Sequence, residues 1–154
     1  MYANIGLALI SFRFYEYFRT TDSGVRGTVA ARLSAVANEC SSSSGGATTL
    51  WCSDIYNACD SNTLAYTSPS DNVVVSCPLY FSNLPVITRS CHAQDMATTT
   101  LHEFTHAQGV FSPGTDDNAY GYSASVSLSS GAAVLNADTF ALYANGELPK
   151  FDNI

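Results

Sequence analysis

Charged side chains are scarce in this sequence of 154 residues, because Asp, Glu, Lys and Arg make up only 12% of it. That is about half of the usual share of roughly a quarter. Six basic residues stand against thirteen acidic ones, which gives a net charge of −7. So few cations exclude a basic surface for nucleic acids or anionic membranes. The negative charge would suit a cationic substrate, although it more often serves only solubility.

Two further patterns are missing from the chain. No apolar run is long enough to span a bilayer, and the short one at residues 5–10 runs into aromatic and charged residues. None of the five cysteines forms a CxxC pair, which excludes a zinc-finger spacing. Five cysteines in so short a chain indicate an oxidising compartment and disulfides. We therefore expect a secreted protein, with at least one cysteine that has no partner in this chain.

The length favours one domain with a substantial core. Residues 1–13 lack the cleavage signature of a signal peptide, so we expect a doubtful N-terminus there, truncated or wrongly joined. We assign residues 14–154 to the folded domain.

Hydrophobic spacing and turn residues predict an α+β domain that is mostly helical. Helices are expected over residues 22–39, 92–108 and 132–145, with Asp22 or Ser23 capping the first, Ser90 the second, and Gly109 and Gly146 as stops. Short β-prone pieces predict a small sheet from residues 48–51, 73–76 and 79–81.

The most informative segment is His102-Glu103-Phe104-Thr105-His106. On a helix, side chains at i and i+4 project from nearly the same face, so the two imidazoles converge. Converging neutral histidines are a zinc clamp, and the adjacent glutamate is placed as a general base. The alternative is a pair of ordinary surface or core histidines.

A catalytic zinc needs a third protein ligand and an open position. The distal histidine of metzincins is excluded, because position 112 is Ser112 and no histidine follows His106. The remaining candidates are downstream carboxylates, among which Asp116 and Asp117 follow a Ser-Pro-Gly turn that can return the chain towards the helix end. The full set of candidates is Asp116, Asp117, Asp138, Glu147 and Asp152.

The HExxH motif followed by Gly-Thr-Asp-Asp-Asn-Ala-Tyr-Gly at residues 114–121 resembles the aspzincin pattern HExxH plus GTxDxxYG. The surrounding sequence, from about residue 14 to 145, resembles the deuterolysin branch of fungal secreted zinc endopeptidases. This resemblance implies a single-domain zincin that holds one catalytic Zn²⁺ through His102, His106 and Asp117. It also implies that Tyr120 hydrogen-bonds the reacting carbonyl oxygen.

Two further carboxylates have less defined roles. Asp116 occupies the variable place of the second motif and ranks as a neighbour of the site. The resemblance places Asp138 near the active site, where it would orient a ligating histidine or line a substrate pocket; the alternative is a solvent-facing helix residue. We expect His92 to have no functional part.

The resemblance also pairs Cys59 with Cys77. Family members tie the positions of Cys52 and Cys91 to cysteines near the two ends of the domain, but this chain has none before Cys40 or after Cys91. Both terminal links are therefore in doubt, and Cys40 could pair with Cys52 or remain free.

The leading hypothesis is a secreted, monomeric zinc endopeptidase that cleaves proteins or peptides, with basic proteins favoured by the acidic charge. Zinc would acidify its bound water, and Glu103 would take the proton and pass it to the leaving amine. One alternative is a lysine-specific endopeptidase of the same family. Another is a truncated, inactive zinc-binding homologue that acts as a binding or effector protein.

Overall fold

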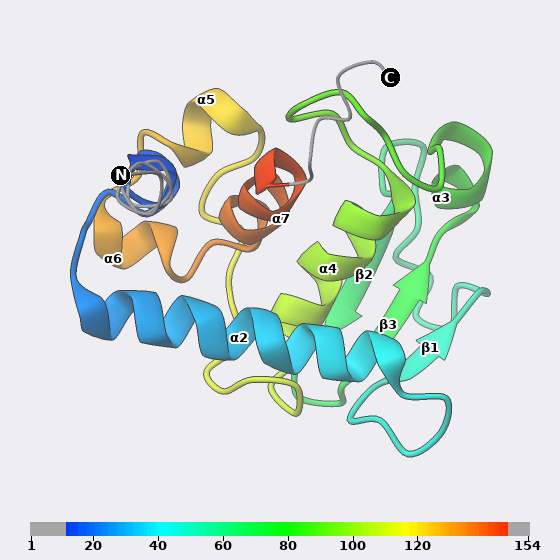
Figure 1. The fold of residues 1–154 in the computed structure, drawn as a ribbon. Coiled ribbons are helices and arrows are strands. Elements are labelled where there is room, and N and C mark those ends of the chain that lie inside the picture. The colour runs from blue at the N-terminus through cyan, green and yellow to red at the C-terminus, as the bar shows by residue number, and fades with distance from the viewer. Residues whose placement is uncertain (1–11, 148–154) are drawn as a thin grey trace, which may run out of the picture.

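The computed structural model describes residues 12–147 (Figure 1). The described chain begins in a helix at residues 12–18. The elements that follow are α2 (Ser23–Ser41), β1 (Thr49–Trp51), β2 (Ala65–Ser68), β3 (Val73–Ser76), α3 (Pro78–Asn83), α4 (Met96–His106), α5 (Tyr122–Ser125), α6 (Ser130–Ala133) and α7 (Ala137–Glu147). The α+β, mainly helical prediction is confirmed. Residues 1–11 of the doubtful N-terminal segment lie outside the described part.

The three strands form one sheet in the order β1-β3-β2. β3 is central because it is the most apolar strand, with Val74 and Val75 buried. β1 runs parallel to it, with Thr49 opposite Val73, and β2 runs antiparallel, with Ala65 opposite Ser76. β2 is therefore an edge strand, and it packs against α4.

α4 lies at the centre of the molecule, between β2 and α7, and α2 crosses beneath it (Figure 1). One hydrophobic cluster joins the first helical residues to α2, α6 and α7, and consists of Phe14, Tyr17, Phe18, Val29, Ala133, Phe140 and Leu142. A second cluster joins α2, β3 and α4 through Val36, Val74 and Phe104. These two clusters hold α4 in place from several directions.

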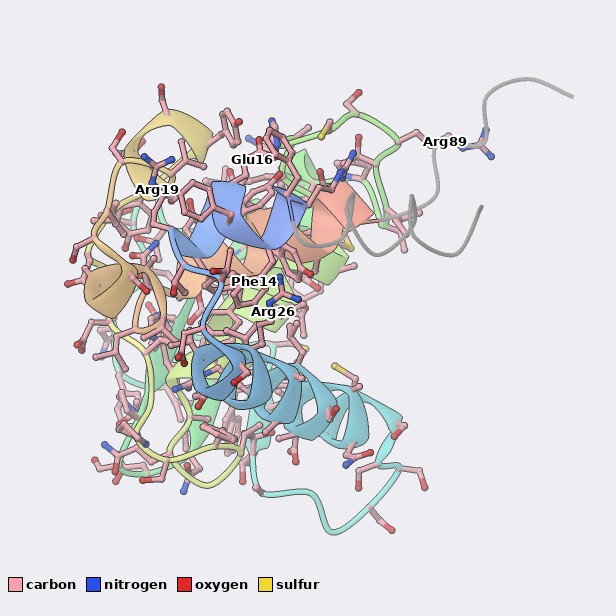
Figure 2. The ribbon with its side chains drawn as sticks, turned by 60° about the vertical axis from the view of Figure 1, so that its left-hand side comes forward. Phe14, Glu16, Arg19, Arg26 and Arg89 are labelled. Atoms are coloured by element: carbon pink, nitrogen blue, oxygen red, sulfur yellow. A yellow bond between two sulfur atoms is a disulfide. The ribbon has the colours of Figure 1, made fainter. Side chains whose placement is uncertain are left out.

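Side chains of the helix at residues 12–18 contact both α2 and α5. The Arg26 guanidinium lies 5.1 Å from the centre of the Phe14 ring, and Figure 2 shows the two side by side. Glu16 accepts a hydrogen bond from the hydroxyl of Tyr122 in α5. Arg89, by contrast, projects outward from an exposed loop.

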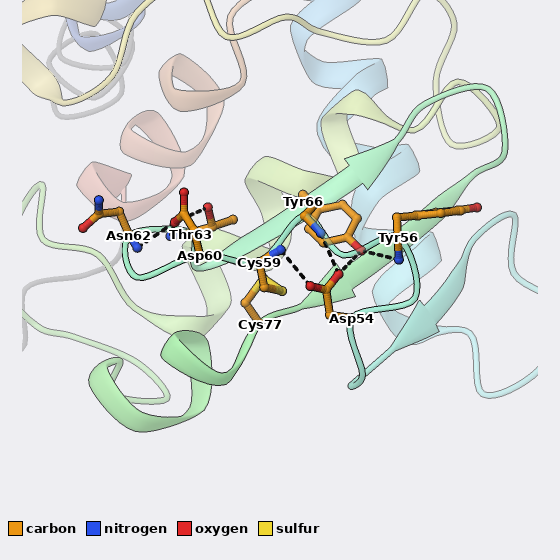
Figure 3. The surroundings of a disulfide bond; sticks show 9 residues. Asp54, Tyr56, Cys59, Asp60, Asn62, Thr63, Tyr66 and Cys77 are labelled. Carbon is orange, nitrogen blue, oxygen red and sulfur yellow. Dashed lines mark hydrogen bonds between the residues drawn. A yellow bond between two sulfur atoms is a disulfide. The ribbon is translucent and has the colours of Figure 1, made fainter.

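One disulfide joins Cys59 to Cys77, with a Cα–Cα distance of 5.6 Å, so the predicted pair is confirmed (Figure 3). It ties a turn-rich loop to the start of α3. In that loop Asp54 accepts hydrogen bonds from the Cys59 amide, at 2.9 Å, and the Tyr66 hydroxyl, at 2.7 Å. Cys40, Cys52 and Cys91 are free and exposed.

Several predicted boundaries are wrong for local reasons. Residues 79–81 are helical rather than extended, because Pro78 at the first helical position starts α3 after Cys77. The central helix starts at Met96 instead of residue 92, and Asp95 caps it rather than Ser90. His92 has a φ of 64°, which a helix does not accommodate.

The end of the chain also differs from the prediction. The expected helix over residues 132–145 is split into α6 and α7, because the backbone between them pairs Asn136 with Asp116. α7 continues through Gly146, which is not a stop. The predicted strand at 73–76 and the Asp22 cap of α2 are confirmed, whereas β2 was not predicted. Within the described residues, no helix is long and apolar enough to cross a membrane.

Candidate metal centre

α4 carries the three residues of the HExxH motif and starts at a defined place. The Asp95 side chain accepts a hydrogen bond from the Thr98 amide at 2.7 Å, and the Thr98 hydroxyl lies 3.1 Å from the Asp95 amide, which forms a capping box. His102, Glu103 and His106 are all buried at the other end of the helix. The helix therefore presents these three side chains to the interior in a fixed register.

The loop after α4 turns back onto the end of the helix, as the Ser-Pro-Gly turn predicted. The Thr115 amide donates to the Thr105 carbonyl at 3.0 Å, and the hydroxyls of Thr105 and Thr115 lie 2.7 Å apart. Gly114 touches the helix so closely that a Cβ there would lie 2.2 Å from the His106 carbonyl oxygen. Only glycine fits this contact, which brings Asp117 opposite the histidines.

The side chains of His102, His106 and Asp117 form a cluster that could hold a metal ion. Their ligand atoms all lie within 4.8 Å of one another. Asp117 Oδ1 is 3.1 Å from His102 Nε2 and 3.4 Å from His106 Nε2. Zinc bonds of about 2.0–2.1 Å at tetrahedral angles separate two ligand atoms by about 3.3 Å. The spacing of Asp117 from each histidine therefore fits a tetrahedral zinc ion.

Hydrogen bonds orient both imidazole rings. His106 Nδ1 lies 2.8 Å from the Thr115 carbonyl oxygen, and His102 Nδ1 lies 3.1 Å from Asp138 Oδ1. Because these oxygens only accept, each Nδ1 carries the hydrogen, and in the neutral ring each Nε2 turns its lone pair towards Asp117. Two lone pairs and a carboxylate oxygen thus converge on one point, an arrangement that can coordinate a cation.

The pKa shifts of the three clustered side chains also favour positive charge at this site. Burial by itself would lower the pKa of His102, but hydrogen bonds with the carboxylates of Asp117 and Asp138 raise it to about 10. The pKa of His106 is raised in the same way, against its burial, by Asp117 and the Thr115 carbonyl. The same hydrogen bonds hold the pKa of Asp117 well below its usual range, although burial opposes them. The donor set therefore suits a divalent cation.

Glu103 lies beside this cluster and is held by β2. The Thr67 hydroxyl is 2.7 Å from Glu103 Oε2 and 3.0 Å from its carbonyl oxygen. Burial raises the pKa of Glu103, whereas His102 and the Thr67 hydrogen bond act in the opposite direction without cancelling the rise. A carboxylate with a raised pKa is suited to accept a proton near neutral pH.

Asp138 at the start of α7 has both carboxylate oxygens engaged. Oδ1 faces His102 Nδ1, and Oδ2 accepts from the Gly121 amide at 2.5 Å. Asp138 is buried and therefore not the solvent-facing residue of the alternative prediction. Asp116 instead acts through its backbone, because its amide donates to Leu135 at 2.8 Å and its carbonyl accepts from Ala137 at 3.1 Å.

Tyr120 lies at the mouth of the site. Tyr120 is 64% exposed, and its ring lies nearly parallel to that of His102, with centroids 6.1 Å apart. Partial burial and a hydrogen bond to Asp117 raise the pKa of its hydroxyl. The phenol therefore stays protonated at neutral pH and can donate a hydrogen bond.

A cavity of about 790 Å³ opens over the cluster. It is lined by the HExxH residues together with residues of β2, of the loop at residues 92–94 and of α7. It is large enough for a peptide segment of a few side chains. His92 also lines it, and its ring stacks on that of Tyr122 with centroids 3.8 Å apart.

The structure thus brings together the residues that the sequence singled out for the site, namely His102, Glu103, His106, Asp117, Tyr120 and Asp138. Glu147 ends α7, and Asp152 lies outside the described residues. The sequence analysis did not identify three residues that contact the site: Thr67, which contacts Glu103, Thr115, which contacts His106, and Arg32 in α2, which donates to the Thr105 carbonyl. Thr115 belongs to the second motif, so its position was available, whereas no local pattern marks Thr67 or Arg32.

The fold and this cluster define a small α+β protein with a metal-site geometry of the HExxH class. A sequence model described as the deuterolysin metalloprotease (M35) family matches residues 4–152. The chain therefore belongs to the deuterolysin metalloprotease family.

Similar proteins from fungi agree with this assignment. A neutral protease 2 homologue from Neosartorya fischeri is 64% identical over 141 residues, and one from Aspergillus fumigatus is 65% identical over 137. These matches cover 92% and 89% of this chain but only 39% and 37% of the relatives, so the chain spans about two fifths of their length.

The fold is also similar to that of a solved structure, a zinc peptidase from Grifola frondosa. The TM-score is 0.66, and the match covers 86% of this chain and 75% of that one. The sequence identity is 24%, so this likeness supports the fold alone.

Proposed function

We propose that the chain is a zinc-dependent endopeptidase that hydrolyses peptide bonds in proteins. The observation that carries this proposal is the convergence of two imidazole nitrogens and the Asp117 carboxylate beside a buried glutamate, all of which line one cavity. His102, His106 and Asp117 would hold the zinc. When bound, zinc would polarise the substrate carbonyl and lower the pKa of a coordinated water.

The residues of this chain supply the remaining chemistry. Glu103 takes a proton from water and later delivers it to the leaving amine, for which its raised pKa is suited. Tyr120 turns its hydroxyl from Asp117 to the oxygen of the scissile carbonyl, where a protonated phenol stabilises the developing negative charge. Asp138 keeps His102 in the tautomer that leaves Nε2 for the metal.

The acidic chain supports a preference for basic protein substrates, because its net charge of −7 attracts cationic chains. A disulfide and few charged residues support secretion. Asp138 does not support lysine-directed cleavage, since both of its carboxylate oxygens are already engaged by His102 and the Gly121 amide.

The central test is the substitution Glu103→Gln. We expect the variant to bind zinc as the parent does but to lose peptide cleavage, because an amide cannot accept the proton. Cleavage of protamine and casein, with and without a zinc chelator, measures the activity, and mass mapping of the products reports any selectivity for lysine. Normal cleavage by Glu103→Gln would refute the assigned base.

Cleavage assays of the unsubstituted protein distinguish an active enzyme from an inactive homologue. The folded, zinc-loaded chain should cleave protamine faster than casein, and the chelator should stop both reactions. Cleavage that the chelator does not affect, or no cleavage at all, would contradict the proposed activity.

A further inference from the structure

Arg32 is a buried arginine in the middle of α2, only 1% exposed. Its guanidinium donates to two backbone carbonyls, from Nη1 to Thr105 at 3.1 Å and from Nη2 to Pro113 at 2.8 Å. The rings of Phe111 and Phe140 enclose it, with centroids 4.6 and 5.3 Å from the guanidinium carbon. The side chain therefore fills a cage between α2, the end of α4 and the following loop.

This arginine is an unusual choice for a core position. Among the described residues, no carboxylate forms an ion pair with it, and its Nε has no hydrogen-bond partner. Burial lowers its pKa to about 10, so it stays charged at neutral pH. The carbonyl end of α4 and the two aromatic rings stabilise this charge. An apolar side chain would avoid the cost of desolvation, which points to a role beyond packing.

The two carbonyls that Arg32 binds belong to the two segments that build the metal cluster. Thr105 precedes the ligand His106, and Pro113 starts the turn that leads through Gly114 and Thr115 to Asp117. One rigid fork thus joins the helix to the loop. The same Thr105 carbonyl accepts the Thr115 amide, so Arg32 completes the contact between the two segments.

We propose that Arg32 is a positioning residue, which holds the loop that carries Asp117 against the end of α4 and thereby sets the affinity of the cluster for zinc. This inference rests on the zinc site of the proposed function. It differs from that function in its test, which measures metal affinity rather than cleavage.

The experiment compares Arg32→Met with Arg26→Met. Both arginines lie on α2 against phenylalanine rings, but Arg26 packs on Phe14, in the N-terminal cluster. Zinc affinity is measured by competition with a chelator of known affinity, and stability by thermal unfolding of the metal-free proteins. We expect Arg32→Met to weaken zinc binding by about tenfold or more, as removal of outer partners of a metal site commonly does. Arg26→Met should lower stability while zinc affinity stays within about twofold.

Two further variants test whether Arg32 affects zinc binding through the loop that carries Asp117. In an Asp117→Ala background the loop no longer supplies a ligand, so adding Arg32→Met should cause no further loss of zinc affinity. Arg32→Lys keeps the charge without the fork, and it should fold with an intermediate loss. If Arg32→Met does not fold, the zinc affinity of Arg32→Lys tests the proposal in its place.

Three results would separate the possibilities. No zinc binding by the parent protein would refute the proposed zinc site itself. Unchanged affinity in the folded Arg32 variants would overturn only the positioning role. An equal loss with and without Asp117 would also overturn it, because Arg32 would then act through α4 rather than the loop.

Discussion

At the scale of residues, the site depends on contacts that give each side chain one orientation. The backbone carbonyl of Thr115 and the carboxylate of Asp138 assign the tautomers of the two histidines. Without them the Nε2 atoms could carry hydrogens and repel a cation. Glu103 is oriented in the same way by one hydroxyl, that of Thr67.

Replacement of Thr67 by valine removes this hydroxyl while it conserves shape. We expect kcat to fall by about tenfold to a hundredfold with little change in KM or zinc affinity, because the glutamate loses its fixed position. Steady-state kinetics on a peptide substrate measures the effect, and Thr67→Ser should restore most of the rate.

Thr63→Val is the matched control, since Thr63 lines the same cavity but directs its hydroxyl to Asp60. A similar loss of kcat in both valine variants would show that the hydroxyl of Thr67 has no special role.

At the scale of elements, α4 determines the geometry of the metal site, because His102, Glu103 and His106 all lie on this one helix. Its N-cap is the buried residue Asp95, which also accepts a hydrogen bond from the Thr88 amide at 2.8 Å. Asp95 therefore ties the preceding loop to the helix. α2 has a simpler cap, in which exposed Asp22 accepts from the Val25 amide at 2.9 Å.

We expect Asp95→Ala to lower the free energy of unfolding by about 2 kcal/mol, because it removes a cap and leaves the half-buried amides of Thr88 and Thr98 without their acceptor. Asp22→Ala, the matched control, should cost no more than about 1 kcal/mol. Urea unfolding of the two metal-free variants measures both. Equal losses would contradict the second function of Asp95, as a tie to the loop at Thr88.

At the scale of the whole molecule, three separate segments meet at the metal cluster. α4 contributes His102 and His106, the loop at residues 113–121 contributes Asp117, and the start of α7 contributes Asp138, which contacts His102. Two lone pairs and a carboxylate held together without a cation are an unfavourable arrangement. A bound ion would therefore stabilise the packing of all three segments.

Zinc should consequently raise the melting temperature of the protein. At a free zinc concentration 100 times the Kd, the stabilisation is about 2.7 kcal/mol. Thermal unfolding in zinc buffers and in excess chelator measures it. His106→Ala should remove most of this effect of zinc on the melting temperature. If zinc does not change the melting temperature of the unsubstituted protein, the proposed zinc site is wrong.

The predictable part of the site is the part that depends on local spacing. His102, Glu103 and His106 share a helix, where a separation of four residues places side chains on one face whatever the rest of the chain does. The choice of Asp117 over Asp116 came from the motif. Geometry now separates the two, because the backbone of Asp116 is pinned to Leu135 and Ala137 while the Asp117 side chain faces the histidines.

The sequence by itself determined the HExxH helix, the returning turn and the mixture of helices and short strands, since each follows from local periodicity and turn chemistry. Only the tertiary structure decided that Thr67 orients Glu103 and that Arg32 joins α4 to the ligand loop. These contacts span 36 and 73 residues. No local pattern encodes such pairs, because they arise only when packing of the core brings distant segments together.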